Sequence, residues 1–260
     1  MAEKPNILIA VPAYGGTIKR GCVGSVIRLI LELVKQRIEF AYKDIDLSDV
    51  HLMRNVFASI LVQDSSHSHM LFFDSDMTVA PNSILRMVLA DKDVIACAAP
   101  KKTLDLNAAL DFARNGDSNA AAIAKASEFN VRAANGVHVD THGRVALGPT
   151  EAIGAAVMLI KRSALLKMID TGKLRKQTKH AHAQSGLTGP LYGFFDTVFD
   201  GDNALTEDYS FCARYQDLCA QPIFALANED IGHIGSFIYR SKITDRIYAG
   251  VKTPDSSVKV

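Results

Sequence analysis

Apolar residues follow two kinds of pattern along the first hundred residues of this chain. Short apolar runs predict strands, at residues 7–11, 39–45, 70–73 and 94–98. Longer segments carry apolar residues every three or four positions and predict amphipathic helices, at residues 22–36, 49–63 and 83–90. Because strand and helix alternate, we expect a doubly wound, mixed but mainly parallel sheet flanked by helices.

The pattern changes after residue 100. Residues 101–137 are rich in Ala, Asn, Asp and Lys and show no clear strand, although residues 106–125 favour helix. Small and polar residues of this kind bury little apolar surface. We therefore interpret residues 101–150 as a mobile insert in the sheet domain.

Strand and helix signals return after the insert. Apolar runs at residues 153–160 and 222–226 predict two more strands, and Thr206 can cap a helix over residues 207–218. The end of the chain is polar and predicts a frayed tail. The expected organisation is thus one domain in two halves, residues 1–100 and 151–240. The insert at residues 101–150 separates the halves, and the tail at residues 241–260 follows them.

The composition narrows the class of protein. With 260 residues, 48% of them hydrophobic, the chain can bury one large core or two closely fused ones. The formal net charge is +1, so no overall field favours nucleic acid or acidic partners. No apolar stretch approaches the roughly 20 residues of a membrane span, and the first apolar run is too short for a signal peptide.

The cysteines indicate a reducing compartment. Cys22, Cys97, Cys212 and Cys219 are scattered, lie mostly among apolar residues and form no C-x-x-C pair. Such cysteines are typical of reduced core thiols. We therefore expect a cytoplasmic protein.

Two carboxylates directly follow the third predicted strand. The apolar run at residues 70–73 ends in Asp74, Ser75 and Asp76. In open α/β sheets, ligands bind outside the carboxyl ends of the strands. Two carboxylates there are costly unless a cation meets them, and a divalent metal carrying a phosphorylated substrate is the natural candidate. A D-x-D triplet by itself is more often a solvated turn or a helix cap.

Four other segments accompany this triplet in a fixed order along the chain. They are the strand and turn at residues 9–14, Arg54 with Asn55, Glu207 with Asp208, and Gly232 with His233. With these five segments the chain resembles family-2-like nucleotide-sugar glycosyltransferases of the GT-A fold, over residues 6–100 and 150–236. Its P-A-Y-G-G and E-D-Y-x-F-C-x-R segments are also similar to sugar transferases encoded by bacteriophages.

This resemblance implies a Rossmann-like GT-A sheet in which residues 1–100 bind a nucleotide sugar. It implies that residues 151–240 bind the acceptor and carry catalysis. The enzyme would then be a metal-dependent glycosyltransferase, and a hexosyltransferase in particular. Its acceptor hydroxyl would belong to a glycan, a protein or a hydroxylated DNA base, and the last of these would make it a DNA-modification enzyme.

The resemblance further implies a donor-nucleotide site at the ends of the first strands. Tyr14 would stack on the base, or Pro12 would form a wall of the base site. The alternative is that these residues form only an ordinary turn between a strand and a helix. Arg54 matches an arginine that approaches the nucleotide, and a surface salt bridge is its alternative. The residues implied for the donor nucleotide are Pro12, Ala13, Tyr14, Asp46, Arg54, Asp74 and Ser75.

A divalent cation, Mn²⁺ or Mg²⁺, follows from the same resemblance, with Asp74, Asp76 and His233 as its ligands. Oxygen ligands suit either ion, and an added imidazole favours Mn²⁺. On an extended segment Asp74 and Asp76 point the same way. Either one reaches the ribose while the other binds the metal, or both bind it. The ion would neutralise the charge of the leaving diphosphate.

Glu207 and Asp208 are the catalytic residues that the resemblance implies. Acidic residues in a first helical turn also complement the helix dipole, so a purely structural role is the alternative. Asp208 would be the general base that removes the proton of the acceptor hydroxyl in an inverting displacement. In a retaining enzyme it would orient the acceptor instead. The residues that we place at the acceptor are Gly154, Phe194 and Phe195, with a core role as the alternative for the two rings.

Two other functions are open on the sequence. A nucleotidyltransferase acting on a sugar phosphate also uses carboxylates and metal on a similar sheet. Its usual loop of glycine and basic residues has only a faint counterpart in Gly15, Gly16, Lys19 and Arg20. The second function that the sequence leaves open is that of a non-catalytic binding module with a GT-A-like fold. The sequence does not fix the donor sugar, the base, the acceptor, the stereochemistry or the oligomeric state.

Overall fold

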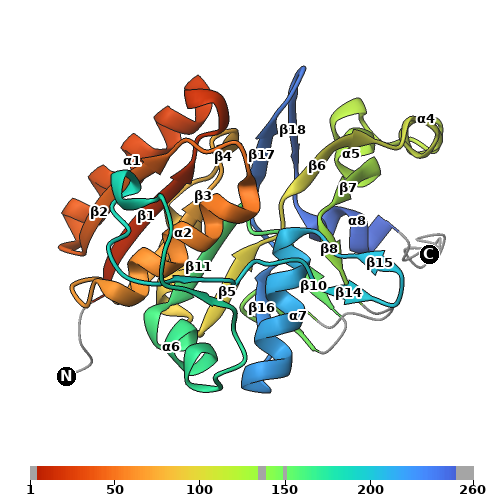
Figure 1. Ribbon diagram of the computed structural model, residues 1–260. Coiled ribbons are helices and arrows are strands. Elements are labelled where there is room, and N and C mark those ends of the chain that lie inside the picture. The colour runs from red at the N-terminus through yellow and green to blue at the C-terminus, as the bar shows by residue number, and fades with distance from the viewer. Residues whose placement is uncertain (1–4, 134–138, 149–150, 250–260) are drawn as a thin grey trace.

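Seven strands form the central sheet of this protein, and helices cover both of its faces (Figure 1). The computed structural model describes residues 5–133, 139–148 and 151–249. The strands of the central sheet, in spatial order, are β2 (Glu39–Ile45), β1 (Asn6–Pro12), β3 (His69–Phe73), β11 (Val157–Lys161), β5 (Val94–Cys97), β16 (Ile223–Leu226) and β9 (Arg144–Leu147). The predicted α/β class, a mixed sheet flanked by helices, is confirmed.

Most strands of this sheet run in one direction. β1 pairs in parallel with β2 and β3, and β5 pairs in parallel with β16. β11 lies antiparallel between β3 and β5, and β9 pairs antiparallel with β16. The carboxyl ends of β1, β2 and β3 therefore meet at one edge of the sheet, where ligands bind in folds of this class.

Each face of the sheet has its own helices because side chains alternate along the strands. α1 (Arg20–Gln36) and α3 (Pro81–Leu89) pack on the face that carries Ile9 and Leu71. The opposite face carries Phe72 and Met158. The helices that cover this second face are α2 (Val50–Gln63), α6 (Arg162–Asp170) and α7 (Glu207–Cys219).

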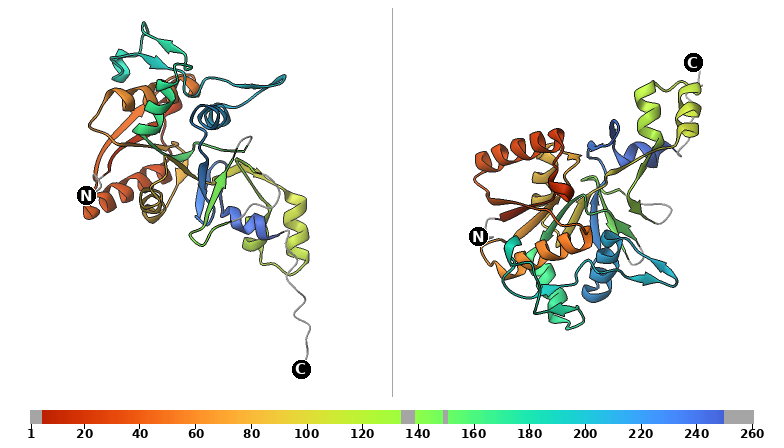
Figure 2. Two further views of the ribbon diagram at one scale, coloured as in Figure 1. Left: turned by 90° about the horizontal axis from the view of Figure 1, so that it is seen from below. Right: turned by 45° about the horizontal axis from the view of Figure 1, so that its top comes forward.

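The insert contains strands that the sequence pattern did not predict. β6 (Pro100–Leu104) pairs antiparallel with β7 (Ser127–Phe129), and α4 (Leu106–Arg114) and α5 (Asn119–Ala126) lie between them. Figure 2 shows these helices at one end of the molecule. β6 was missed because its Pro-Lys-Lys-Thr-Leu sequence contains no apolar run.

The segment expected to be a tail contains a helix, α8 (Ile243–Ala249), which packs against α5. The polar end of the chain, for which the frayed tail was predicted, lies outside the described residues, so that prediction stays untested. None of the helices in the described ranges is long and apolar enough to cross a membrane.

Small sheets and turns complete the fold. β18 (Ile238–Ser241), β17 (Ile231–Ile234) and β4 (Met77–Thr78) form a three-stranded sheet. The two-stranded pairs are β10 (Ala152–Ile153) with β8 (Val131–Arg132), β12 (Lys176–Gln177) with β13 (Leu191–Tyr192), and β14 (Phe199–Asp200) with β15 (Asn203–Ala204). The short 3-10 helices are η1 (Tyr14–Gly16) and η2 (Ala183–Ser185).

Candidate functional site

Two clefts share Asp74, at the carboxyl end of β3. The first, here named the Tyr14 cleft, has a volume of about 310 Å³, and its lining includes Pro12, Tyr14, Ser48, Asp74, Ser75 and Asp76. The second, the Asp208 cleft, has a volume of about 440 Å³, and its lining includes Arg54, Asp74, Lys102, Glu207, Asp208 and His233. The structure thus brings together most of the residues that the sequence analysis assigned to the donor, the metal and catalysis.

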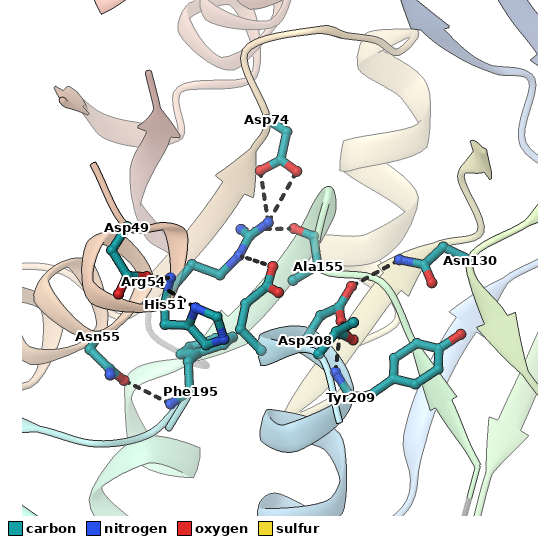
Figure 3. A network of polar contacts seen from close by, with 12 residues as sticks. Asp49, His51, Arg54, Asn55, Asp74, Asn130, Ala155, Phe195, Asp208 and Tyr209 are labelled. Atoms are coloured by element: carbon teal, nitrogen blue, oxygen red, sulfur yellow. Dashed lines mark hydrogen bonds and ion pairs between the residues drawn. The ribbon is translucent and has the colours of Figure 1, made fainter. Parts of the chain in front are cut away.

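Arg54 is a buried cation between two carboxylates. It lies near the start of α2, where Asp49 caps the helix by accepting hydrogen bonds from the backbone N–H groups of His51 and Leu52. Its Nη2 donates to both carboxylate oxygens of Asp74 at 3.0 Å, and its Nε lies 3.4 Å from Oε1 of Glu207. Figure 3 shows the guanidinium between the Asp74 carboxylate and the carbonyl oxygen of Ala155.

This burial excludes the alternative of a surface salt bridge for Arg54. The residue is only 3% exposed, and a guanidinium that has lost its water is costly without opposite charges beside it. Asp74 and Glu207 supply those charges from positions 20 and 153 residues away along the chain. The three residues therefore form one charged network on the floor of the Asp208 cleft.

Asp74 binds a proton more tightly than an ordinary aspartate. Burial raises its pKa to about 6, against the opposing effect of the Arg54 guanidinium. The nearby negative charges of Asp76 and Glu207 act in the same direction as burial. A carboxyl group with such a perturbed pKa at the wall between two clefts is typical of a functional site.

Asp76 faces different partners. Lys102 Nζ lies 2.5 Å from its Oδ2, and His233 Nε2 lies 3.4 Å from the same oxygen. His233 reaches this position because β17 pairs with β4, which places it opposite Met77. Burial acts to raise the pKa of Asp76, but hydrogen bonds from His233 and Lys102 outweigh it and lower the pKa to about 2.

The ring of His233 is oriented by the backbone. Its Nδ1 lies 2.8 Å from the carbonyl oxygen of Pro100, which can only accept a hydrogen bond. Nδ1 therefore carries a proton, and Nε2 is the nitrogen that faces Asp76. Donation of one ring N–H to a backbone carbonyl oxygen is a common way to orient a metal-binding histidine.

The two aspartates of the D-x-D triplet do not point the same way. The segment forms a turn in which the Met77 N–H donates to the Asp74 carbonyl oxygen at 3.0 Å, and Asp74 turns to Arg54 while Asp76 turns to Lys102. The prediction that both lie on an extended segment is wrong. Both oxygens of Asp74 are occupied by Arg54, so Asp74 does not join Asp76 in a preformed metal site.

Asp76 and His233 together fit part of a divalent site. Over the described ranges, no group of three His, Cys, Asp or Glu side chains is placed to hold a metal ion. A carboxylate and an oriented imidazole nevertheless suit Mn²⁺ or Mg²⁺ when substrate phosphates and water complete the coordination, as is common for Mg²⁺. The donor set is therefore compatible with a cation that binds together with a diphosphate.

Asp208 is buried in the wall of the Asp208 cleft, in the first turn of α7. Its Oδ2 accepts a hydrogen bond from Asn130 Nδ2 at 2.8 Å (Figure 3). Its Oδ1 accepts from the backbone N–H of Tyr209 at 2.8 Å and from the hydroxyl of Thr206. These donors fix its orientation, and all of them are neutral.

Glu207 differs from Asp208 in its partner. Its carboxylate pairs with Arg54, whereas Asp208 accepts only from uncharged groups. The predicted catalytic pair is therefore divided into one carboxylate that neutralises a buried cation and one that does not.

Two residues predicted for the donor lie behind the Tyr14 cleft. Asp46 Oδ1 accepts a hydrogen bond of 2.9 Å from the Gly15 N–H and so holds the η1 turn. Ala13 is buried, and its N–H donates to the carbonyl oxygen of Ile45 at 2.9 Å. Both residues support the exposed ring of Tyr14, and neither belongs to the lining of the cleft.

The acceptor role of the two phenylalanines is contradicted by their burial. Phe194 and Phe195 are both fully buried. Phe195 stacks on Phe211 with ring centroids 4.5 Å apart and meets Phe72 edge to face at 5.5 Å. The rings belong to the core beneath α7, because two consecutive aromatic residues have the same pattern in a core and in a binding loop.

Gly154 does not line an acceptor floor either. It is buried, and a Cβ added to it would lie 2.4 Å from Asn130 Nδ2. Its small size therefore makes room for Asn130, which holds Asp208. Asn130 and Lys102 are among the site residues that the sequence analysis missed. Lys102 follows a predicted strand and carries charge, which is a weak signal, and Asn130 has none.

Comparison with known proteins finds only distant structural likenesses. No family model and no curated protein matches it. A197 from STIV is 14% identical over 88% of this chain and 86% of that chain, with a TM-score of 0.47. A 4-diphosphocytidyl-2C-methyl-D-erythritol synthase from Anaerococcus prevotii is 9% identical over 70% and 81%, with a TM-score of 0.34.

HddC from Yersinia pseudotuberculosis is 8% identical over 62% of this chain and 78% of that chain, with a TM-score of 0.29. Likenesses this distant carry no argument about activity. The function has to be argued from the chemistry of the two clefts.

Proposed function

We propose that this protein transfers a sugar from a nucleotide-sugar donor to a hydroxyl group of an acceptor, with a divalent cation held by Asp76 and His233. The observation that carries the proposal is the position of Asp74 in the walls of both clefts. A nucleoside fits the Tyr14 cleft, and a sugar with an attacking hydroxyl fits the Asp208 cleft. The diphosphate joins them past Asp74 and Asp76.

The nucleoside part of the donor has a suitable surface in the Tyr14 cleft. The exposed Tyr14 ring offers a face for stacking on a base. Ser48 and Ser75, also in the lining, supply hydroxyl groups that both donate and accept hydrogen bonds. The volume of about 310 Å³ lies at the lower end of the range for small-molecule sites, which suits a single nucleoside.

Asp76 and His233 are the residues that would hold the cation. Asp76 stays ionised at neutral pH because its pKa is lowered to about 2, and His233 presents Nε2 because Pro100 holds its other nitrogen. A bound Mn²⁺ or Mg²⁺ supplies positive charge to the diphosphate. Lys102, which occupies Asp76 Oδ2 in this structure, is then free to pair with the same phosphates.

Asp208 is the general base of the proposed reaction. It removes the proton from the acceptor hydroxyl as the oxygen attacks the anomeric carbon, and the bond from that carbon to the diphosphate breaks. Thr206, Tyr209 and Asn130 keep the carboxylate in place during the transfer. A direct displacement of this kind inverts the anomeric configuration.

Product analysis with a panel of nucleotide sugars and Mn²⁺ tests this function. We expect release of a nucleoside diphosphate, and stabilisation of the protein by that diphosphate with Mn²⁺ that Asp76→Asn abolishes and His233→Ala weakens about tenfold. Release of pyrophosphate from a nucleoside triphosphate and a sugar phosphate would indicate a nucleotidyltransferase instead. Lys19 and Arg20 do not line the Tyr14 cleft, which favours the first outcome. Stabilisation by no nucleotide would indicate a non-catalytic module.

A further inference from the structure

A third cleft lies between α7 and the β14–β15 hairpin. This hairpin cleft has a volume of about 470 Å³, and its lining includes Arg132, Phe199, Asp200, Leu205, Gln216 and Asp217. Ser210 on α7 accepts a hydrogen bond of 3.0 Å from the Val198 N–H and donates one of 3.2 Å to the Leu205 carbonyl oxygen. The base of the hairpin is thereby fixed to the helix, so both walls of the cleft are anchored.

Gln216 holds a buried, unpaired acceptor in the wall of this cleft. The residue is only 8% exposed, and its Nε2 donates to the carbonyl oxygens of Leu147 at 3.1 Å and Glu151 at 3.2 Å. These two bonds fix the orientation of the amide. Within the described ranges its Oε1 has no hydrogen-bond partner. Buried polar atoms are almost always paired in folded proteins, so this oxygen is an exception in the wall of the cleft.

Arg132 contributes an unpaired donor. Its Nε is buried and has no hydrogen-bond partner in the part of the chain that the structure describes. The guanidinium lies 5.6 Å from the centroid of the Tyr209 ring. Asp200 and Asp217 add two carboxylates to the lining, and the ring of Phe199 at its edge is 68% exposed.

The chemistry of the lining selects for hydroxyl groups. A hydroxyl donates one hydrogen bond and accepts others, so a polyhydroxylated ligand can pair with the carboxylates of Asp200 and Asp217 and with the guanidinium of Arg132. An exposed aromatic ring offers an apolar face to the C–H groups of a sugar ring. A polyanion such as nucleic acid is disfavoured, because two carboxylates stand against one guanidinium.

The hairpin cleft and the Asp208 cleft are lined by residues that are neighbours in the sequence. Asn130 lines the Asp208 cleft and holds Asp208, while Arg132, two residues later, lines the hairpin cleft. Thr206 and Leu205 are neighbours that likewise line one cleft each. A ligand of two linked units can therefore place one unit in each cleft.

We propose that the hairpin cleft binds a neutral sugar unit of the acceptor, so that the acceptor is a glycan. The role of this sugar as part of the acceptor rests on the proposed transferase function, whereas the binding of a sugar in the hairpin cleft does not. The reacting sugar would lie in the Asp208 cleft and the preceding or following unit in the hairpin cleft.

Saturation-transfer NMR with neutral disaccharides tests the proposal on the intact protein without donor or metal. The probes are maltose, cellobiose, lactose and chitobiose. We expect at least one of them to bind, and Phe199→Ala to weaken that binding about tenfold. Phe237→Ala is the matched control, because Phe237 is also an exposed phenylalanine, at 51%, but lies next to the β17–β18 hairpin. Its binding of the sugar should equal that of the wild type.

Binding of none of these sugars, or equal binding in Phe199→Ala and the wild type, would overturn the proposal. Binding of an oligodeoxynucleotide that Phe199→Ala abolishes would overturn it as well. Binding of a nucleoside diphosphate with Mn²⁺ is measured on the same protein. Its absence, together with sugar binding that depends on Phe199, would reject the transferase function and support the sugar site.

Discussion

Lys102 and a divalent cation would compete for the same oxygen of Asp76. Lys102 Nζ lies 2.5 Å from Asp76 Oδ2, and its side chain is 42% exposed. Ion pairs with this much exposure stabilise a protein by little, about 1 kcal/mol at most. A divalent ion with two charges would therefore displace the lysine, and the displaced ammonium group would remain in the cleft proposed for the diphosphate.

Replacement of this lysine should strengthen cation binding. In Lys102→Met the competitor for Asp76 is gone, so we expect Mn²⁺ affinity to rise about two- to fivefold. The measurement is titration of free Mn²⁺ by electron spin resonance. Lys101→Met is the control, because Lys101 lines the same cleft but its Nζ lies 3.9 Å from Glu128. Unchanged or weaker Mn²⁺ binding in Lys102→Met would contradict the competition.

The raised pKa of Asp74 has a consequence for stability. Its pKa is about 6 in the folded protein against an ordinary value of 3.8, so folding favours the protonated form. This contribution to stability is complete below pH 3.8 and is lost as the pH rises through 6. In Asp74→Asn the group cannot titrate, and the contribution is absent at every pH.

Denaturation of both proteins at about pH 4 and about pH 7 measures this linkage. Between these values the free energy of unfolding of the wild type should fall relative to that of Asp74→Asn by on the order of 2 kcal/mol. Titration of the other carboxylates is shared by both proteins and cancels to first order. If the free energy of unfolding of the wild type stayed constant or rose relative to that of Asp74→Asn between these pH values, Asp74 would not bind its proton in this way.

At the scale of elements, the pairing of β8 with β10 positions Asp208, the proposed general base. The Gly154 N–H donates to the Asn130 carbonyl oxygen at 2.8 Å, directly after β10, and Asn130 in turn holds Asp208. A larger residue at position 154 would therefore act on Asp208 through Asn130. The glycine is needed for space, since its added Cβ would lie 2.4 Å from Asn130 Nδ2.

Gly154→Ala should displace Asn130 from Asp208. We expect a loss of about 1–3 kcal/mol in the free energy of unfolding from overpacking. Turnover should fall by more than nucleotide affinity does, because the donor cleft is not touched. Gly24→Ala in α1 is the matched control, since its Cβ would meet only the flexible end of Arg28, at 3.4 Å, and helix propensity favours the alanine. Equal losses of turnover and of nucleotide affinity in Gly154→Ala would argue against the role of Asn130.

At the scale of the whole molecule, the sheet was predictable because its buried strands are apolar runs separated by amphipathic helices. The antiparallel position of β11 between β3 and β5 was not, since an apolar run looks the same in either direction. β6 was missed because its sequence is mostly polar, and α8 was missed because a helix of seven residues is too short to show a clear repeat.

The site was predictable in its residue types and less so in their partners. Asp76 and His233 were expected together and lie together. The pairing of Asp74 with Arg54 and the contact of Lys102 with Asp76 depend on how distant segments pack, and no local spacing encodes them. Phe194 and Phe195 were placed at the acceptor because sequence alone does not separate a buried ring from a binding ring.

Turnover of Asp208→Asn tests the central claim most directly. The change keeps the shape of the side chain and removes the proton acceptor. With a nucleotide sugar that the wild type consumes in the presence of Mn²⁺, we expect nucleoside diphosphate release to fall about 100-fold or more. Affinity for the nucleoside diphosphate should stay within a few fold of the wild-type value, since Asp208 does not line the Tyr14 cleft. Turnover near the wild-type rate would contradict the account and transfer the role of base to Glu207.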